Sequence, residues 1–239
     1  MKIVRKITAI ILAGGKGSRM QTEIPKQYLD LCGKPVLYYS LKCFEESTVD
    51  DIVLVTGKDG MDYCKKNIVE RYRFQKVKCI VQGGSERYWS VKSGLDAARG
   101  TDYVLIHDAA RPCITKEMVE NSILEVENSG ACTVGIPAKD TIKIVDENGF
   151  GIETPPRNCL WQVQTPQSFR YSDIMEAYYK MEQADDRDIT DDTMIIERYL
   201  GKKTKIIWGS YYNLKITTHE DLVVAETFLK KIKKVVDME

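Results

Sequence analysis

Glycines and cations occur together near the start of the chain, in the stretch Leu-Ala-Gly-Gly-Lys-Gly-Ser-Arg-Met at residues 12–20. Glycine has no Cβ, so the backbone N–H groups of such a loop can approach an anion closely. Arg19, and Lys26 a few residues later, would supply the matching positive charge. The preceding apolar run, residues 7–12, predicts a buried strand that holds the loop. This combination predicts a phosphate-binding site.

Two familiar phosphate-binding patterns do not fit this loop. No Gly-Lys-Ser/Thr follows Gly14 or Gly15 at the spacing of a P-loop. Met20 stands where the dinucleotide fingerprint requires its third glycine. The sequence therefore disfavours a P-loop ATPase and a nicotinamide-dependent enzyme. Taken alone, the loop is also compatible with a solvated glycine turn.

Two further polar segments follow strand-like runs. Gly83-Gly84-Ser85-Glu86-Arg87 comes after residues 77–81 and begins a helical pattern, with Ser85 the expected N-cap. His107-Asp108-Ala109-Ala110-Arg111-Pro112 comes after residues 103–106. There, Asp108 could bind a hydrated cation and Arg111 a phosphate, although a simple ion pair between them is the plainer alternative.

A third segment, Asn213-Leu214-Lys215-Ile216-Thr217-Thr218, follows the strand-like run 205–208. Thr218 and Asp221 fit the start of a helix, so Lys215 is the residue of functional interest here. In open α/β sheets, ligands bind at the carboxyl ends of the strands, where these segments are expected to lie.

The elements that would position these residues alternate along the first half of the chain. Strands are predicted at 7–12, 52–56, 77–81, 103–107 and 132–136, and helices at 35–46, 61–72, 86–98 and 116–128. This order predicts an α/β fold with a doubly wound, mainly parallel sheet.

The alternation stops at residues 138–164, where β-type residues, a turn at 146–149 and Pro155-Pro156 occur without a helical pattern. We predict a hairpin arm with strands at 141–145 and 150–153. A two-stranded ribbon is only marginally stable in water, so the arm is expected to pack against another surface. No linker divides the chain, which predicts a single domain, 1–239, with an arm at about 138–164.

Composition excludes several classes of protein. The 35 basic and 35 acidic residues balance, whereas a protein that binds a nucleic-acid backbone normally has a basic excess. The hydrophobic content of 43% is ample for a core. No run reaches the roughly 18 apolar residues of a membrane span, and the N-terminus lacks a long apolar segment. We therefore expect a cytoplasmic protein that binds neither nucleic acid nor membrane.

Seven cysteines are scattered without a Cys-x-x-Cys pair, and the chain has only two histidines. A zinc site or a Ser-His-Asp triad is therefore disfavoured. The cysteines are expected to be reduced and partly buried. Cys113 lies near Arg111 in sequence, which could perturb its thiol, but a passive role is the favoured interpretation.

Taken together and in order, the polar segments resemble the 2-C-methyl-D-erythritol 4-phosphate cytidylyltransferase family. The matching motifs are Arg19-Met20, Pro25-Lys26-Gln27-Tyr28, Gly83-Gly84-Ser85-Glu86-Arg87, Ser90-Val91, His107-Asp108-Ala109-Ala110-Arg111-Pro112, Asp140-Thr141-Ile142-Lys143, Gln164-Thr165-Pro166-Gln167 and Asn213-Leu214-Lys215-Ile216-Thr217. The resemblance covers nearly the whole chain. It implies a Rossmann-like nucleotidyltransferase sheet and transfer of a cytidylyl group from CTP to 2-C-methyl-D-erythritol 4-phosphate, with release of pyrophosphate.

The resemblance also implies roles for individual residues on the nucleotide side. Arg19 and Lys26 would stabilise negative charge on the α-phosphate and the leaving pyrophosphate, with Mg²⁺ or another divalent cation bridging the triphosphate. Asp108 would touch the metal, the ribose or the acceptor's hydroxyls, which makes it the one candidate metal ligand. Nucleotide binding would involve Ala13, Gly14, Gly15, Gly84, Ser85, Ser90 and Ala109.

On the acceptor side, the resemblance assigns Lys215 of the same subunit and Arg157 of a partner subunit. Residues expected nearby are Arg111, Thr141, Thr165 and Thr190. Family members are homodimers whose arms embrace, so Thr141 and Arg157 are expected to reach the neighbour's active site.

Two alternatives remain open from the sequence. The ribitol-5-phosphate cytidylyltransferases, which make CDP-ribitol for teichoic acid, share much of the pattern. Gly14-Gly15, Tyr212-Asn213 and the run 164–169 also suit them, whereas the motifs at 107–112 and 140–143 favour the methylerythritol enzymes. A regulatory protein that binds nucleotide without turnover would be expected to lack Arg19, Lys26 or Lys215, and all three are present.

Overall fold

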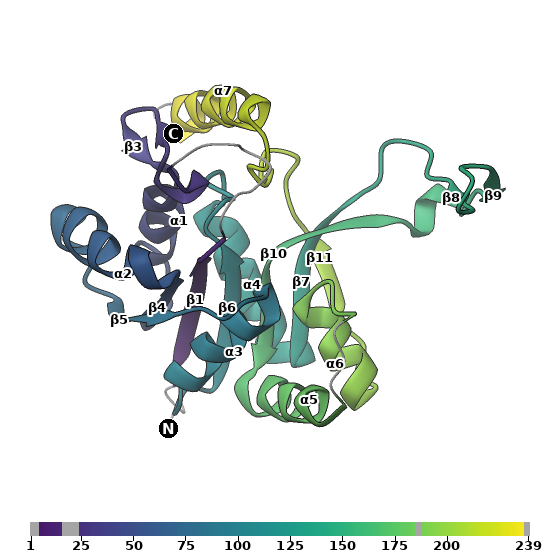
Figure 1. Ribbon diagram of the computed structural model, residues 1–239, viewed down its shortest axis with the longest axis horizontal. Helices are drawn as coiled ribbons and strands as arrows, with labels where there is room; N and C mark the ends of the chain where they lie inside the picture. Colours follow the sequence, from purple (N-terminus) through teal and green to yellow (C-terminus); the bar gives the residue numbers. More distant parts are fainter. Residues whose placement is uncertain (1–4, 16–23, 185–187, 237–239) are drawn as a thin grey trace.

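The computed structural model describes residues 5–15, 24–184 and 188–236. Its centre is a seven-stranded sheet in the order β11-β7-β10-β6-β1-β4-β5 (Figure 1). The strands are β1 (Ile7–Ala13), β4 (Asp51–Thr56), β5 (Val77–Gln82), β6 (Tyr103–Asp108), β7 (Ala131–Pro137), β10 (Trp161–Arg170) and β11 (Lys205–Trp208). Strand β10 is antiparallel to β6 and β7, and the other neighbouring pairs are parallel. The predicted mainly parallel sheet is confirmed.

Helices cover both faces of this sheet (Figure 1). One face packs against α1 (Val36–Glu45), α4 (Lys116–Ser129) and the π-helical segment η4 (Cys64–Glu70). The other packs against α3 (Arg87–Ala97), α5 (Tyr171–Ala184) and α6 (Asp192–Leu200). The doubly wound arrangement is therefore confirmed.

A smaller apolar cluster joins α7 (His219–Val236) to α1 and to the hairpin of β2 (Asp30–Leu31) and β3 (Lys34–Pro35). The helix begins where the sequence predicts, because the Asp221 carboxylate accepts hydrogen bonds from the backbone N–H groups of Thr217 and Thr218. This cluster holds the segment that carries Lys215 against the body of the domain.

Strand β1 is apolar along its length because both of its faces are covered. Ile7 and Ile11 contribute to the core on the α1 side, and Ile10 contributes to the core on the α3 side. This is the pattern expected of a central parallel strand, and it ends where the glycine loop begins.

Two local predictions need correction. The helix expected at 61–72 is divided into a short α2 (Met61–Tyr63) and η4. The N-cap of α3 is Glu86 rather than Ser85, and its side chain makes no capping hydrogen bond. Nearby short helical turns are η2 (Lys26–Tyr28) and η3 (Lys58–Gly60).

The predicted arm leaves the body between β7 and β10 and projects away from the sheet (Figure 1). Its ribbon consists of β8 (Ile144–Val145) and β9 (Gly151–Glu153), so the two strands are shorter than expected. A 3₁₀ turn, η5 (Arg157–Cys159), follows them. Residues 161–164, which the sequence places in the arm, belong to β10 and are part of the main sheet.

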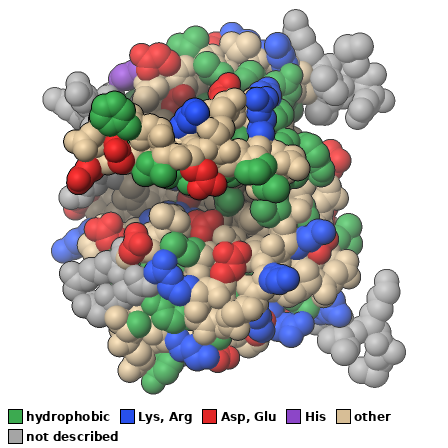
Figure 2. Space-filling model, turned by 90° about the vertical axis from the view of Figure 1, so that its right-hand side faces the viewer, with side chains coloured by type: hydrophobic (Ala, Val, Ile, Leu, Met, Phe, Trp, Pro, Cys, Tyr) green, Lys and Arg blue, Asp and Glu red, His purple; other side chains and the backbone are tan. Residues whose placement is uncertain are grey.

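Apolar side chains on the arm face outward rather than into a core. Phe150 is 73% exposed and Ile152 67% exposed, and Ile142, Ile144 and Val145 are exposed as well. Figure 2 views the molecule from the side of the arm and shows hydrophobic side chains at the surface of its upper half. A surface of this kind is typical of a segment that packs against another molecule.

All seven cysteines are free thiols, as predicted. Burial raises the pKa of the Cys113 thiol to about 12, which favours the passive interpretation of that residue over a reactive one. Among the helices of the described ranges, none is both long and apolar enough to cross a membrane.

Candidate active site

A cavity of about 500 Å³ lies at the carboxyl ends of β1, β5 and β6. It brings together the segments that the sequence predicted to converge. The residues that line it are Leu12, Ala13, Gly14, Gly15, Lys26, Gln27, Gly84, Ser85, Glu86, Arg87, Ser90, Asp108, Ala110 and Lys215. Its volume lies within the range of small-molecule sites.

Both glycine segments line this cavity. A Cβ on Gly84 would overlap Cβ of Trp89 on the first turn of α3, so this position requires glycine. A Cβ on Gly15 would meet no heavy atom of the described residues within 4 Å, so packing against that part of the chain does not require glycine there. A glycine at this position also lets a ligand approach the backbone closely.

Gln27 is part of the motif Pro25-Lys26-Gln27-Tyr28, but the sequence predicts no role for it. Its side chain is buried, and its Nε2 donates to the carbonyl oxygen of Ala13 at 2.6 Å. This bond ties η2 to the end of β1 and fixes Lys26, the neighbouring residue, at the edge of the cavity.

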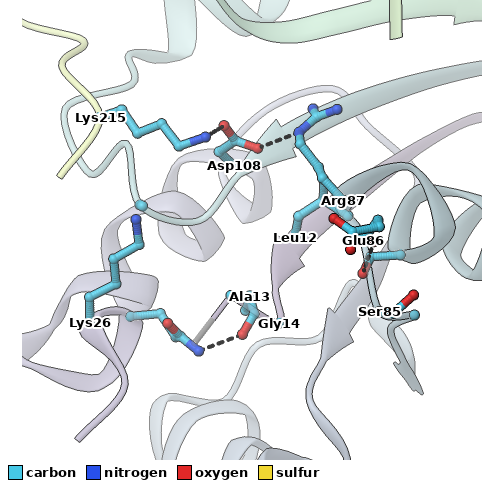
Figure 3. Close-up of a pocket in the computed structure, with 14 residues that line it drawn as sticks. Leu12, Ala13, Gly14, Lys26, Ser85, Glu86, Arg87, Asp108 and Lys215 are labelled. Atoms are coloured by element: carbon cyan, nitrogen blue, oxygen red, sulfur yellow. Dashed lines mark hydrogen bonds and ion pairs between the residues drawn. The ribbon is translucent and has the colours of Figure 1, made fainter. Parts of the chain in front are cut away.

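Lys26 is held from a second direction. Its Nζ donates to the carbonyl oxygen of Ile216 at 2.8 Å, next to Lys215. Figure 3 shows Lys26 and Lys215 on the same side of the pocket, across from Ser85 and Glu86. Two cations thus lie along one side of the cavity. Arg19, the other predicted cation of the loop, lies outside the described residues.

Three charged side chains form a row along one end of the cavity (Figure 3). Nζ of Lys215 lies 2.7 Å from one oxygen of Asp108, and Nε of Arg87 lies 3.3 Å from the other. Burial alone would raise the pKa of Asp108, but Arg87, Lys215 and Arg111 hold it well below its usual range. Asp108 is therefore an anion that keeps two cations in place at neutral pH.

The alternative of a simple Asp108–Arg111 ion pair is wrong. Nη1 of Arg111 instead donates to the carbonyl oxygen of Asn213 at 2.8 Å. Burial lowers the pKa of Arg111, although Asp108 partly counters this effect. The Arg111 guanidinium is thus fixed beside Asp108 without being neutralised by a direct pair.

A second cavity, of about 320 Å³, adjoins the first. The residues that line it are Arg87, Asp108, Arg111, Val163, Gln164, Thr165, Gln167, Thr190, Asp191 and Lys215. Arg87, Asp108 and Lys215 line both cavities. The row of three charges is therefore the boundary between two adjacent binding spaces.

Thr165 holds the backbone of Asp108, and His107 in turn contacts Thr165. Oγ1 of Thr165 accepts the N–H of Asp108 at 3.2 Å and lies 2.9 Å from Nδ1 of His107. Burial lowers the pKa of His107 to about 3, so its ring is neutral at physiological pH. Thr165, predicted as a substrate contact, lines the second cavity and also positions Asp108.

Some predicted residues are not brought to these cavities. Ala109 is buried in the core, its N–H donates to the carbonyl oxygen of Leu12, and it lines neither cavity. Its prediction as a direct contact is not supported, because the strand end turns it inward. Its neighbour Ala110 lines the first cavity instead.

Thr141 and Arg157 contact each other on the arm, where Nη2 of Arg157 donates to Oγ1 of Thr141 at 3.1 Å. Neither residue lines either of the two cavities described above. Their contact places both residues together on the projecting arm, and their reach into a neighbour's active site stays a prediction.

Asn213 does not discriminate between the two acceptor classes that the sequence left open. It is fully buried, and its Nδ2 donates to Gln164 Oε1 and to the carbonyl oxygen of Thr165. It therefore holds β10 beside the segment that carries Lys215, which is a structural role in an enzyme with either acceptor.

The described residues do not form a Mg²⁺ site of their own. Among them, no group of three or more histidine, cysteine, aspartate or glutamate side chains is placed to hold a metal ion. Both oxygens of Asp108 face cations, which is unfavourable for binding another one. The described side chains therefore do not fit the prediction that Asp108 is a metal ligand.

Comparison with known proteins agrees with this geometry. Residues 7–231 match the family model of the 2-C-methyl-D-erythritol 4-phosphate cytidylyltransferases, IspD. The protein of that name from Alkaliphilus oremlandii is 50% identical over 232 residues, which covers 96% of this chain and 98% of the relative. The one from Lachnoclostridium phytofermentans is 47% identical over 228 residues, which covers 95% and 98%.

A solved structure is also similar. The 4-diphosphocytidyl-2C-methyl-D-erythritol synthase of Anaerococcus prevotii matches with a TM-score of 0.83 and 33% identity, covering 95% of this chain and 96% of that one. The chain belongs to the 2-C-methyl-D-erythritol 4-phosphate cytidylyltransferase family.

Proposed function

We propose that this protein transfers the cytidylyl group of CTP to the phosphate of 2-C-methyl-D-erythritol 4-phosphate and releases pyrophosphate. The observation that carries the proposal is the pair of adjacent cavities that share Arg87, Asp108 and Lys215 as a common wall. A transfer between two phosphorylated substrates needs two binding spaces that meet where the phosphates react. The names of the family's members supply the identities of the two substrates.

CTP would occupy the larger cavity, because this cavity is lined by both glycine segments and by Lys26. Backbone groups around Gly14, Gly84, Ser85 and Ser90 would contact the base and ribose in a narrow slot. Lys26 would stabilise charge on the triphosphate as the bond to the leaving pyrophosphate breaks. The same role for Arg19 rests on the family resemblance alone.

The acceptor would occupy the smaller cavity, where Thr190 and Arg111 lie beside the shared row. One of its phosphate oxygens would attack the α-phosphorus of CTP in line with the departing pyrophosphate. This reaction needs no nucleophile from the protein. Catalysis would come from orienting two polyanions and offsetting their repulsion, which Lys215, Arg87 and Arg111 are placed to do.

We propose that magnesium enters with the nucleotide, as the Mg²⁺ complex of CTP, and is therefore part of the substrate. Among the described residues, no group of three or more histidine, cysteine, aspartate or glutamate side chains is placed to hold a metal ion, and Asp108 in the shared wall faces two cations, which supports this view.

We further propose that two copies of the chain associate through their arms. The exposed apolar residues of the arm support an interface, since an isolated two-stranded ribbon is marginally stable. Thr141 and Arg157 would then reach the acceptor cavity of the partner subunit. A cytoplasmic location stays a prediction from the sequence.

The test is pyrophosphate release by the purified protein with Mg²⁺ and CTP. We expect release to depend on 2-C-methyl-D-erythritol 4-phosphate and to be far slower with ribitol 5-phosphate or with ATP, GTP or UTP. Faster release with ribitol 5-phosphate would assign the alternative acceptor. Binding of CTP without pyrophosphate release for any acceptor would instead indicate a regulatory nucleotide-binding protein.

A further inference from the structure

Asp192 is a buried carboxylate just behind the shared wall of the two cavities. It is the first residue of α6, is fully buried, and lines neither cavity. Its neighbour Asp191 already caps the helix, because Asp191 Oδ1 accepts the N–H of Met194. Helix capping therefore does not explain why a second carboxylate is buried at Asp192. Burying a carboxylate is costly unless it has a partner.

The partner is Arg87, which begins α3 on the other side of the site. Nη1 of Arg87 lies 2.9 Å from Oδ2 of Asp192, and Oδ1 of Asp192 accepts the hydroxyl of Tyr178 at 2.7 Å. The N–H of Asp192 donates to Oε1 of Gln167, which fixes the start of α6. The carboxylate is thus held by residues of α3 and α5, and the backbone of Asp192 is held by β10.

Arg87 connects this buried anchor to the site. Its Nε faces Asp108 and its Nη1 faces Asp192, so the guanidinium is held between two carboxylates. The side chain is nonetheless 29% exposed, and it lines both cavities. A long arginine side chain loses considerable rotamer freedom when it is fixed, and a second carboxylate removes that freedom before a ligand arrives.

A gain in folding stability explains the buried ion pair of Arg87 and Asp192 less well. A buried ion pair contributes little net stability compared with apolar residues of similar volume. An arginine that is fixed by two anions, yet open to both cavities, is suited to contact a phosphate at their junction. The second anion lies out of reach of the ligand and so does not repel it directly.

We propose that Asp192 is a positioning residue, which holds the guanidinium of Arg87 at the junction of the two cavities so that it contacts the acceptor's phosphate. The inference rests on the proposed function. It adds to that function a phosphate contact from Arg87 and a buried residue on which this contact depends.

The test compares Asp192→Asn with Tyr178→Phe. Asp192→Asn keeps the shape of the side chain but removes the charge that faces Arg87. Tyr178→Phe removes the hydrogen bond on the other oxygen and leaves the ion pair in place. Pyrophosphate release gives kcat and the KM of each substrate, and thermal unfolding gives Tm.

For Asp192→Asn we expect a rise of about tenfold in the KM of the acceptor or an equal fall in kcat, with the affinity for CTP within about twofold of wild type. Tyr178→Phe is expected to lower Tm without this acceptor defect. In an Arg87→Gln background, Asp192→Asn should cause no additional acceptor defect, because it acts only through Arg87.

Three results would overturn the inference: equal losses of CTP and acceptor binding, the same kinetics for both single variants, or additive effects in the double variant. If Asp192→Asn fails to fold, Arg87→Gln decides alone, since acceptor kinetics like those of wild type would contradict the proposal. An inactive wild-type protein would refute the proposed function instead, so the two failures are distinguishable.

Discussion

Nζ of Lys215 lies 2.7 Å from Oδ2 of Asp108, although 107 residues separate them in the sequence. The contact joins the segment before α7 to the carboxyl end of β6. In the absence of substrate, the carboxylate offsets the charge of Lys215 and keeps the ammonium at the boundary of the two cavities. An arriving phosphate can then share or replace this partner without a large movement of the chain.

Lys26→Ala should lower kcat by about a hundredfold while weakening CTP binding much less, because its contact with the phosphates is proposed to strengthen in the transition state. Steady-state pyrophosphate release and CTP titration measure the two quantities. Lys180→Ala is the matched control, since Lys180 pairs with Glu176 on α5 and lines neither cavity. An unchanged kcat would remove Lys26 from the mechanism.

Gly84→Ala should weaken CTP binding and lower stability by about 1–3 kcal/mol, because the added Cβ overlaps Trp89 and displaces the start of α3. Gly15→Ala is the comparison, because its Cβ would meet no heavy atom of the described residues within 4 Å. We expect Gly15→Ala to keep the wild-type Tm. Any loss of CTP affinity would come from a clash between the added methyl group and the bound nucleotide. Normal CTP binding by Gly84→Ala would be incompatible with the proposed nucleotide slot.

His107 should make folding sensitive to acid. Its pKa is about 3 in the folded protein, against 6.5 for an exposed imidazole, so the unfolded chain binds a proton that the folded chain does not. Stability therefore falls as the pH drops from about 6.5 towards 3, with this residue contributing a slope of up to about 1.4 kcal/mol per pH unit.

The His107→Gln variant should lack this contribution to the pH dependence of stability, even if its stability is lower at every pH. Urea unfolding at several pH values between about 6.5 and 3 measures the dependence. His219→Gln is the control, because His219 is the only other histidine and is exposed. Equal slopes for all three proteins would mean that His107 does not stay neutral in the fold.

Arg157→Ala and Lys26→Ala protomers, each inactive alone, should regain activity when mixed. If Arg157 acts in the partner's site, each mixed dimer has one intact site and one site with both lesions. With random exchange, activity should approach about a quarter of wild type. Mixing Arg157→Ala with Thr141→Ala is the control, since two arm lesions leave no intact site. No recovery despite demonstrated exchange would place Arg157 in the site of its own chain.

The sequence predicted the elements better than the contacts between them. Apolar periodicity identified β1 and the strand before Asp108, since buried parallel strands are apolar on both faces. It did not predict that Ala109 would turn into the core, or that Glu86 rather than Ser85 would be the N-cap of α3. Those details depend on how a few backbone bonds are made at the end of a strand.

Arg87 belongs to a motif that matches the family, but the motif predicts no role for it, and no local sequence pattern indicates a role for Asp192. Their ion pair joins the starts of α3 and α6, and nothing in the local pattern of either segment signals it. Gln27 was missed for the same reason, because its bond to Ala13 exists only once η2 packs against β1. The local sequence pattern predicts which strands end in charged residues. Contacts between residues far apart in the sequence can be identified only in the folded structure.

The structure of the protein with the product, 4-diphosphocytidyl-2-C-methyl-D-erythritol, tests the central claim most directly. We expect cytidine between Gly14 and Gly84 in the larger cavity, and the methylerythritol group beside Thr190 in the smaller one. The diphosphate should cross the row of Lys215, Asp108 and Arg87. A product bound wholly within one cavity, or away from this row, would contradict the assignment of the two cavities to the two substrates.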